Sequence, residues 1–123
     1  MWMIPTKWMC KNHLLGEHNE LHKFLPSFKK QFSISKRVML GSVQIEPMAM
    51  KTRHDELADE IARRWPKNNP HRSPWNEDIN VLLFYLPEHE RTAKVNKDQA
   101  FFDLCERCAA CKKRYEKTKA ENE

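Results

Sequence analysis

Glycine is nearly absent from this sequence, which has 2 glycines in 123 residues. Tight β-hairpins depend on glycine at turn positions with positive φ, so the scarcity favours helices over strands. Apolar runs of about 18 residues are also lacking, so we expect no membrane span. Charged residues interrupt the amino terminus from Lys7 onward, which argues against a secretory signal peptide. The four cysteines are therefore expected to be reduced thiols in a cytoplasmic compartment.

The composition is that of an ordinary globular domain, with 40% apolar and 32% charged residues. We expect an all-α fold, a single compact domain over residues 1–123 with about three main helices joined by long loops. Apolar spacing predicts these helices at about 6–24, 48–65 and 97–119. Residues 1–5 are expected to be extended, and the short apolar run 81–86 fits a helix or a strand. Polar and proline-rich segments predict loops at 29–37, 44–47 and 67–74.

Positive charge is concentrated in the first half of the chain. Residues 1–54 hold nine Lys and Arg against three Asp and Glu, a net charge of +6. Residues 55–123 hold thirteen against fourteen, a net charge of −1, and together the halves give the overall +5. A basic face suits a polyanion such as nucleic acid. A solubilising surface explains the same excess equally well, so the charge alone leaves both interpretations open.

The ten-residue run from His13 to His22 gathers imidazoles and carboxylates on the first predicted helix. His13, Glu17 and Glu20 are spaced i, i+4 and i+7, so they share one helical face. Gly16 inside this helix costs about 1 kcal/mol relative to alanine, and we interpret it as a close approach of another backbone or a ligand. Such a face is typical of an active site or a metal site.

This run, written His13-Leu14-x-x-Glu17-x-x-Glu20-Leu21, is similar to the signature of the pyrimidine-dimer DNA glycosylases, the phage-type endonuclease V family of ultraviolet-damage repair. The segment Arg53-x-x-Glu56-Leu57-x-x-Glu60-x-x-x-Arg64 resembles the family's second helix. Residues 69–74 resemble an N-H-[KR]-S-P loop with a proline inserted, and residues 108–114 resemble the closing C-x-x-C-basic helix. The resemblance implies a small all-helical fold, with the catalytic and DNA-binding part in residues 1–75 and a C-terminal helix over 97–119.

The resemblance also implies a reaction that needs no cofactor. An N-terminal α-amine attacks C1′ of the damaged nucleotide, and the resulting imine allows β-elimination of the 3′ phosphate. An α-amine suits this step because its unperturbed pKa lies near 7.7–8.0. A bulky second residue, Trp2, normally leaves the initiator in place, so the implied nucleophile is the amine of Met1. Glu20 is the implied charge-stabilising carboxylate, and His13 completes the implied catalytic set at the DNA face.

The implied partner is damaged double-stranded DNA, bound by a monomer in the cytoplasm or in that of a phage-infected host. A nucleotide must leave the stack before C1′ can react. The residues leave the lesion open among pyrimidine dimers, oxidised bases and abasic sites. Asn19 replaces a phosphate-binding arginine of better-known members, and Lys36 and Arg37 extend the possible phosphate track. The implied DNA-binding residues are Lys7, Glu17, Lys23, Lys29, Lys30, Gln44, His71 and Arg72, although solvent-exposed residues of these types also occur without any ligand.

Two other arrangements of residues compete with the enzyme hypothesis. His18 and His22 have the i, i+4 spacing of zinc ligands, but the pattern lacks the glutamate directly after the first histidine that metalloproteases require. Cys105, Cys108 and Cys111, with Cys10, offer four thiols, although three ligands on one helix are unusual for structural zinc. We therefore expect no metal ligands and favour buried thiols that pack the last helix against the first. The alternative functions are a non-catalytic basic nucleic-acid-binding module and a metal-dependent hydrolase or metal-stabilised domain.

Overall fold

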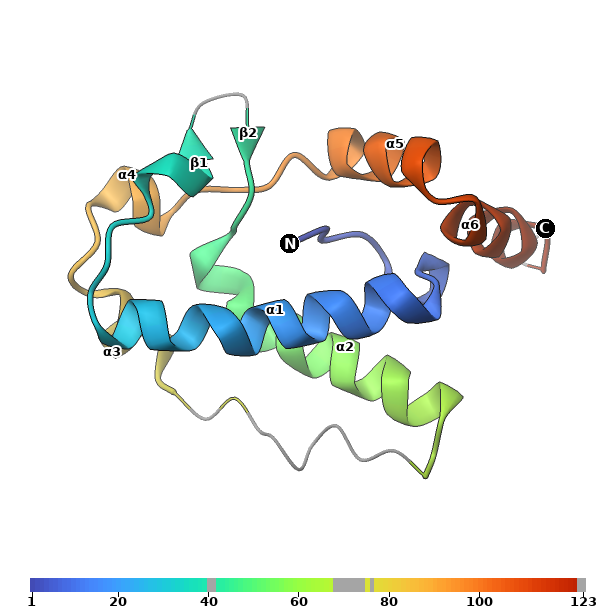
Figure 1. Ribbon diagram of the computed structural model, residues 1–123, viewed down its shortest axis with the longest axis horizontal. Helices are drawn as coiled ribbons and strands as arrows, with labels where there is room; N and C mark the ends of the chain where they lie inside the picture. The colour runs from blue at the N-terminus through green and yellow to red at the C-terminus, as the bar shows by residue number, and fades with distance from the viewer. Residues whose placement is uncertain (40–41, 68–74, 76, 122–123) are drawn as a thin grey trace.

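Two long helices, α1 (Lys11–Lys29) and α2 (Met50–Arg64), form the body of the molecule (Figure 1). The structure is a computed structural model and describes residues 1–39, 42–67, 75 and 77–121. The shorter helices are α3 (Ile79–Leu83), α4 (Glu88–Arg91), α5 (Lys97–Arg107) and α6 (Ala109–Glu121). A two-stranded antiparallel ribbon pairs β1 (Val38–Met39) with β2 (Ser42–Val43). Single 3-10 turns lie at Thr6–Trp8, Ser35–Arg37 and Pro47–Ala49. The described residues are therefore mainly α-helical, as the sequence predicts.

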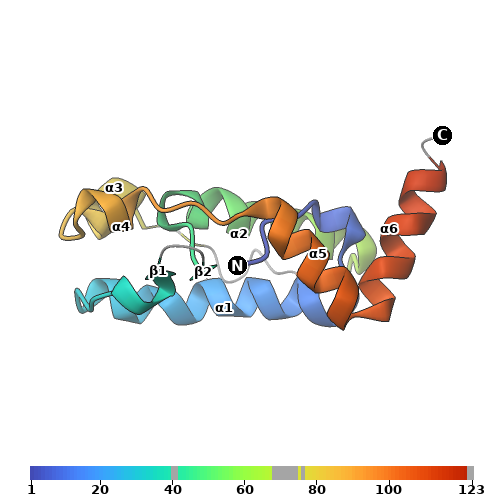
Figure 2. The same cartoon turned by 90° about the horizontal axis from the view of Figure 1, so that it is seen from above.

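The helices form two layers with the N-terminal segment between them (Figure 2). One layer is α1, and the other contains α2, α3 and α4. Helix α6 packs on α5 and on the turn Thr6–Trp8, so the last helix lies beside a segment near the start of the chain. The apolar interior includes Leu14, Leu21, Phe28, Ile45, Met50, Leu57, Ile61, Trp75, Leu83 and Leu104, each 2% exposed or less.

Helix α1 differs from its predicted bounds of 6–24 at both ends. Residues 6–8 form a separate 3-10 turn, and Cys10 is extended (ψ 167°) before the helix begins. At the other end the helix continues through Pro26 to Lys29. A proline inside a helix costs about 3 kcal/mol. Phe24 and Phe28, two residues to either side of it, are both buried, and their burial offsets this cost because each large side chain contributes about 1.5–3 kcal/mol.

Other predicted elements are confirmed or corrected in the same way. The second predicted helix is confirmed as α2, with Leu57 and Ile61 on its buried face. The single helix predicted at 97–119 is wrong, because extended Cys108 (φ −133°, ψ 102°) divides it into α5 and α6. Residues 38–43 contain the β1–β2 pairing although glycine is scarce. The run 81–86 lies partly in α3. Residues 1–5 are neither helix nor strand, but the prediction that they are extended fails at Met3, which has a left-handed φ of 58°, and at the bend at Ile4.

The sequence predicts that another backbone or a ligand approaches Gly16 closely, but the structure has open space there. An alanine Cβ at this position meets nothing within 4 Å, and the residue is exposed in the middle of α1. Because alanine is the better helix former by about 0.8–1.0 kcal/mol, Gly16→Ala is expected to raise the free energy of unfolding by about that amount. Urea denaturation of the two proteins measures the difference, and an unchanged or lower stability would contradict the expectation.

Within the part of the chain that the structure describes, none of the helices is both long and apolar enough to cross a membrane.

Candidate functional site

The first five residues fold back along α1 and bring the chain's amine to the middle of that helix. Ile4 is buried and anchors this segment. Met3 has a left-handed φ of 58°, which costs a non-glycine residue of the order of 1–3 kcal/mol. The backbone N–H of Trp2 donates to Glu17 Oε1 at 3.1 Å. The surrounding contacts therefore hold the segment in a strained, specific path.

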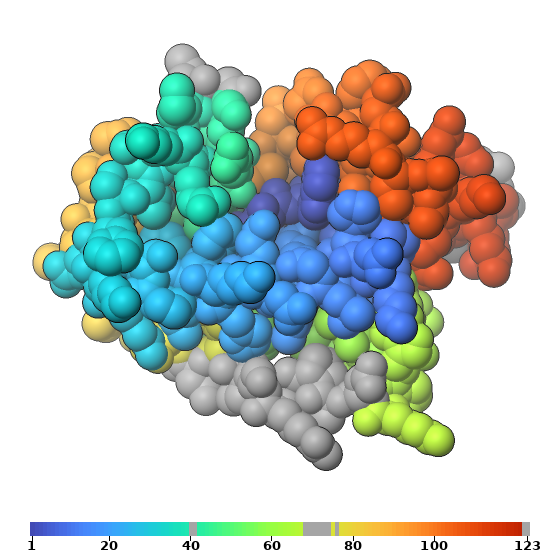
Figure 3. All heavy atoms as spheres, in the orientation of Figure 1, coloured from blue at the N-terminus to red at the C-terminus, as the bar shows by residue number. Residues whose placement is uncertain are grey.

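The α-amine of Met1 lies within hydrogen-bonding distance of two acceptors. It donates to Glu20 Oε1 at 2.8 Å and to the backbone carbonyl of Gln44 at 2.9 Å. The Glu20 side chain is 43% exposed, whereas the Met1 side chain is buried, and the backbone N–H of Glu46 lies 3.4 Å from the Met1 sulfur. In Figure 3 the dark-blue N-terminal atoms lie in a hollow above α1, between the β1–β2 strand pair and α5. The amine is therefore fixed beside a carboxylate on the face shown in that view.

Glu17, one turn before Glu20, accepts a buried bidentate ion pair. Arg53 on α2 donates from Nε to Glu17 Oε2 at 2.5 Å and from Nη2 to Oε1 at 3.0 Å. Both side chains are 2% exposed or less. Both Glu17 oxygens therefore bind groups inside the protein. The prediction that Glu17 contacts DNA does not agree with this position. Its position instead joins α1, α2 and the N-terminal segment at one point.

A pocket of about 320 Å³ opens beside Glu20. Its walls come from the second half of α1 and from the segment leading into the ribbon, and they include Lys23, Phe24, Phe28, Phe32, Ile34 and Arg37. The Arg37 guanidinium lies over the Phe24 ring, 5.2 Å from its centroid. Aromatic walls with a few charged groups fit a flat, partly polar ligand, and the volume is within the usual range of roughly 300–1,000 Å³.

A larger hollow of about 560 Å³ lies elsewhere, between the turn Thr6–Trp8, α2 and α6. Its wall residues Glu60 and Arg63 pair with one another at 2.9 Å (Nε to Oε2). This hydrogen bond holds the pKa of Glu60 below its ordinary value although burial opposes the shift. Arg64 also binds Glu60, and donates to the carbonyls of Thr6 and Met9 at 2.9 and 2.7 Å. These charges are satisfied internally, so we consider the smaller pocket beside the amine the better ligand site.

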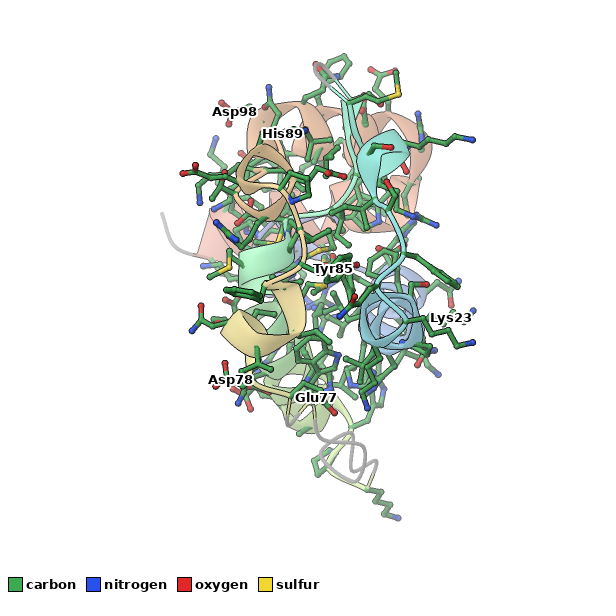
Figure 4. The ribbon with its side chains drawn as sticks, turned by 90° about the vertical axis from the view of Figure 1, so that its left-hand side faces the viewer. Lys23, Glu77, Asp78, Tyr85, His89 and Asp98 are labelled. Carbon is green, nitrogen blue, oxygen red and sulfur yellow. The ribbon has the colours of Figure 1, made fainter. Side chains whose placement is uncertain are left out.

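The other predicted DNA contacts are spread over the surface. Lys23 extends from α1 away from the body of the molecule (Figure 4) and borders the pocket beside Glu20. Gln44 contributes its backbone carbonyl to the amine. Lys29 pairs with Glu77 at 2.8 Å, Lys30 is exposed at the end of α1, and Lys7 lies at the larger hollow, away from Glu20. His71 and Arg72 fall outside the described residues.

His13 shares the helical face of Glu20 but has different neighbours. Its Nδ1 lies 3.2 Å from the Cys10 sulfur and 3.6 Å from the Cys111 sulfur. The Trp2 ring packs edge-on against its imidazole, with centroids 5.7 Å apart. Two helical turns, about 10.5 Å along the axis, separate His13 from Glu20. The two side chains therefore do not act on one reacting carbon. The sequence pattern suggested one site, whereas in the structure Glu20 lies beside the amine and His13 lies beside the cysteines.

Three histidines form a further cluster between α1 and α2. His18 and His22 are joined there by His54, whose Nε2 lies 3.0 Å from His22 Nε2. Their possible ligand atoms lie within 4.8 Å of one another, and His54 Nδ1 contacts the Asp55 carboxylate at 3.1 Å. The sequence identified the first two histidines but gave no signal for His54, because α2 reaches them only through the tertiary packing.

Comparison of the chain with protein-family models, with curated proteins and with solved structures finds no match.

Proposed function

We propose that this protein is a DNA glycosylase with AP-lyase activity, which uses the α-amine of Met1 as its nucleophile and Glu20 as its proton-transferring carboxylate. The contact of 2.8 Å between these two groups is the observation that carries the proposal. An amine and a carboxylate at that distance beside an open pocket have the arrangement that amine-based attack on a sugar requires. The resemblance of the α1 and α2 motifs to the pyrimidine-dimer glycosylases supports the same reaction.

The first step exchanges one C1′–nitrogen bond for another. Glu20 accepts a proton from the Met1 ammonium, and the neutral amine attacks C1′ of the damaged nucleotide. The bond from C1′ to the base breaks, and the base nitrogen keeps the electron pair and takes up the proton that the attacking nitrogen, now a secondary ammonium, gives up. Glu20 then returns a proton to the sugar ring oxygen, so the ring opens and leaves an imine between C1′ and the amine. The carboxylate also stabilises the positive charge that develops at C1′.

The second step is an elimination from the opened sugar. The imine acidifies the C2′ proton, and a base removes it. The C3′–oxygen bond then breaks and the 3′ phosphate leaves with its electron pair, so the strand is cut. Water finally hydrolyses the imine and releases the amine for another turnover. His13 has no part in this scheme, because its imidazole lies with the thiols.

The pocket beside Glu20 supplies a place for the nucleotide that leaves the stack. Phe32, which is 56% exposed, offers a ring surface for stacking, a contact worth about 1–3 kcal/mol per base. Lys23 and Arg37 at its border supply positive charge for adjacent phosphates. Because a pyrimidine dimer already distorts the duplex, extruding a nucleotide there costs less than from intact DNA.

Borohydride reduction tests the proposal, because it converts an imine between protein and DNA into a stable bond. We expect a covalent adduct with duplex DNA carrying either an abasic site or a pyrimidine dimer, and peptide mapping is expected to locate the bond on Met1. A short Gly-Ser extension before Met1 is expected to abolish the adduct, since it moves the free amine away from Glu20. The same extension at the carboxyl end is the matched control, and the intact mass of the purified protein verifies that Met1 is its first residue.

Three outcomes would contradict the proposal. If the protein binds both DNAs but no adduct forms, the chain is the non-catalytic nucleic-acid-binding module considered above. If cleavage proceeds without an adduct and stops on addition of a chelator, the chain is a metal-dependent hydrolase. An adduct whose yield is unaffected by the amino-terminal extension would exclude the Met1 amine as the nucleophile.

A further inference from the structure

Four metal-ligating side chains meet where the beginning and the end of the chain pack together. They are Cys10, His13, Cys108 and Cys111, and one ligand atom from each lies within 4.8 Å of all the others. Cys10 and Cys111 are buried, and His13 and Cys108 are partly buried. The residues form two short pairs, Cys10-x-x-His13 at the start of α1 and Cys108-x-x-Cys111 at the start of α6. Each pair has the spacing typical of one half of a structural zinc site.

The distances between these atoms are close to the edges of a metal-centred tetrahedron. Zinc binds sulfur at about 2.3 Å and nitrogen at about 2.0–2.1 Å, so a tetrahedral site has sulfur–sulfur edges of about 3.8 Å and sulfur–nitrogen edges of about 3.6 Å. The Cys10 and Cys108 sulfurs are 3.8 Å apart. His13 Nδ1 lies 3.6 Å from the Cys111 sulfur and 3.2 Å from the Cys10 sulfur. A disulfide would need about 2.05 Å, and all four cysteines are free.

The backbone around the cluster favours negatively charged sulfur. The Cys10 N–H donates to the Cys111 sulfur at 3.1 Å, and the Cys111 N–H donates to the Cys108 sulfur at 3.4 Å. Cys10 is the residue that caps α1, and helix N-termini stabilise thiolates.

The sequence argues against a zinc site because it predicts three of the cysteines on one helix, but the break between α5 and α6 separates them. One continuous helix would carry Cys105, Cys108 and Cys111 together. Extended Cys108 instead ends α5, so the Cys108–Cys111 pair turns toward α1, and His13 takes the place of the fourth ligand. Cys105 remains outside the cluster of possible ligands.

We propose that Cys10, His13, Cys108 and Cys111 bind one structural zinc ion. Three thiolates and one imidazole satisfy the four positions that zinc prefers, so the site has no open position for a substrate. The ion would join the start of α1 to the α5–α6 junction and fix the end of the segment that leads from Met1. This inference stands independently of the proposed glycosylase activity.

Metal analysis of the purified full-length chain tests the proposal. We expect one zinc per chain, measured by inductively coupled plasma mass spectrometry after exhaustive dialysis. Cys108→Ser and Cys111→Ser are each expected to weaken zinc binding by more than about 100-fold, because the loss of outer-shell partners alone costs about 10–100-fold. Competition with a chromophoric chelator measures this affinity. Cys105→Ser is the matched control, since it removes a neighbouring thiol outside the cluster, and it is expected to retain one zinc with unchanged affinity.

Cobalt substitution keeps the test decisive if a serine variant fails to fold. The wild-type chain loaded with Co²⁺ is expected to show intense visible bands of a tetrahedral ion and a near-ultraviolet sulfur-to-cobalt charge-transfer band. Chelation is expected to abolish both and to expose three further reactive thiols besides Cys105. A chain with no metal and four reactive thiols would overturn the proposal. So would zinc that survives Cys111→Ser but is lost in His54→Gln, because it would then belong to the three histidines.

Discussion

Glu20→Gln is expected to lower the rate of strand cleavage at an abasic site or a pyrimidine dimer by on the order of 10²–10⁴, the usual contribution of a positioned acid–base group. The amide keeps an oxygen that can accept a hydrogen bond from the Met1 ammonium, which now lies 2.8 Å from the carboxylate. It cannot accept a proton from that ammonium or stabilise the charge that develops at C1′. Single-turnover cleavage of end-labelled duplex measures the rate constant.

The control separates this catalytic loss from unfolding. Glu20 is 43% exposed, and exposed ion pairs contribute about 0–1 kcal/mol, so Glu20→Gln is expected to leave the unfolding free energy within about 1 kcal/mol of the wild type. Glu106→Gln changes an exposed carboxylate on α5 and is expected to retain full activity. A Glu20→Gln enzyme that cuts at the wild-type rate would exclude the proposed role of this carboxylate.

Arg53→Met is expected to lower the free energy of unfolding by about 3–5 kcal/mol, because it leaves the Glu17 carboxylate buried without its counter-charge. That loss is a large part of the 5–15 kcal/mol that stabilises a typical domain. The Glu17 oxygens accept from Arg53 at 2.5 and 3.0 Å, and one of them also holds the Trp2 N–H. The same change is therefore expected to loosen the N-terminal segment. Urea denaturation followed by circular dichroism measures the stability.

The same helix offers a matched control for the buried pair. Arg63→Met removes the same kind of charge from a side chain that is 64% exposed and paired with Glu60. Although Glu60 is only 7% exposed, it keeps Arg64 as a second partner at 3.1 Å, so this variant is expected to remain close to the wild type. Equal losses in the two variants would mean that the Glu17–Arg53 pair has no special importance for the fold.

The sequence predicts the two main helices because their apolar spacing is regular, and it predicts their ends poorly because tertiary contacts determine them. Helix α1 continues past Pro26 because the rings of Phe24 and Phe28 are buried. Local sequence preferences alone predict that a helix ends before a proline. The break at Cys108 likewise depends on packing against the start of the chain. The overall scarcity of glycine is a poor guide to the hairpin, because one of the two glycines, Gly41, stands between the paired residues 38–39 and 42–43.

The candidate site was only partly predictable for a related reason. Spacing placed Glu17 and Glu20 on one face, but it could not separate a buried ion-pair acceptor from a carboxylate beside the amine. That difference depends on Arg53, which α2 brings to Glu17 from 36 residues away. The Cys10-x-x-His13 and Cys108-x-x-Cys111 spacings were visible in the sequence, and only the folded chain joins them across 98 residues.

The segment from Met1 to Cys10 is held at both ends, which constrains its length more than its composition. Trp2 is bonded to Glu17 at one end, and Cys10 contacts Cys108 and Cys111 at the other. One inserted or deleted residue shifts an extended chain by about 3.3 Å, more than the 2.8 Å that separates the amine from Glu20. Insertions and deletions between the first and tenth residues would therefore disconnect the amine from its carboxylate, whereas substitutions at exposed positions of this segment would leave that distance unchanged.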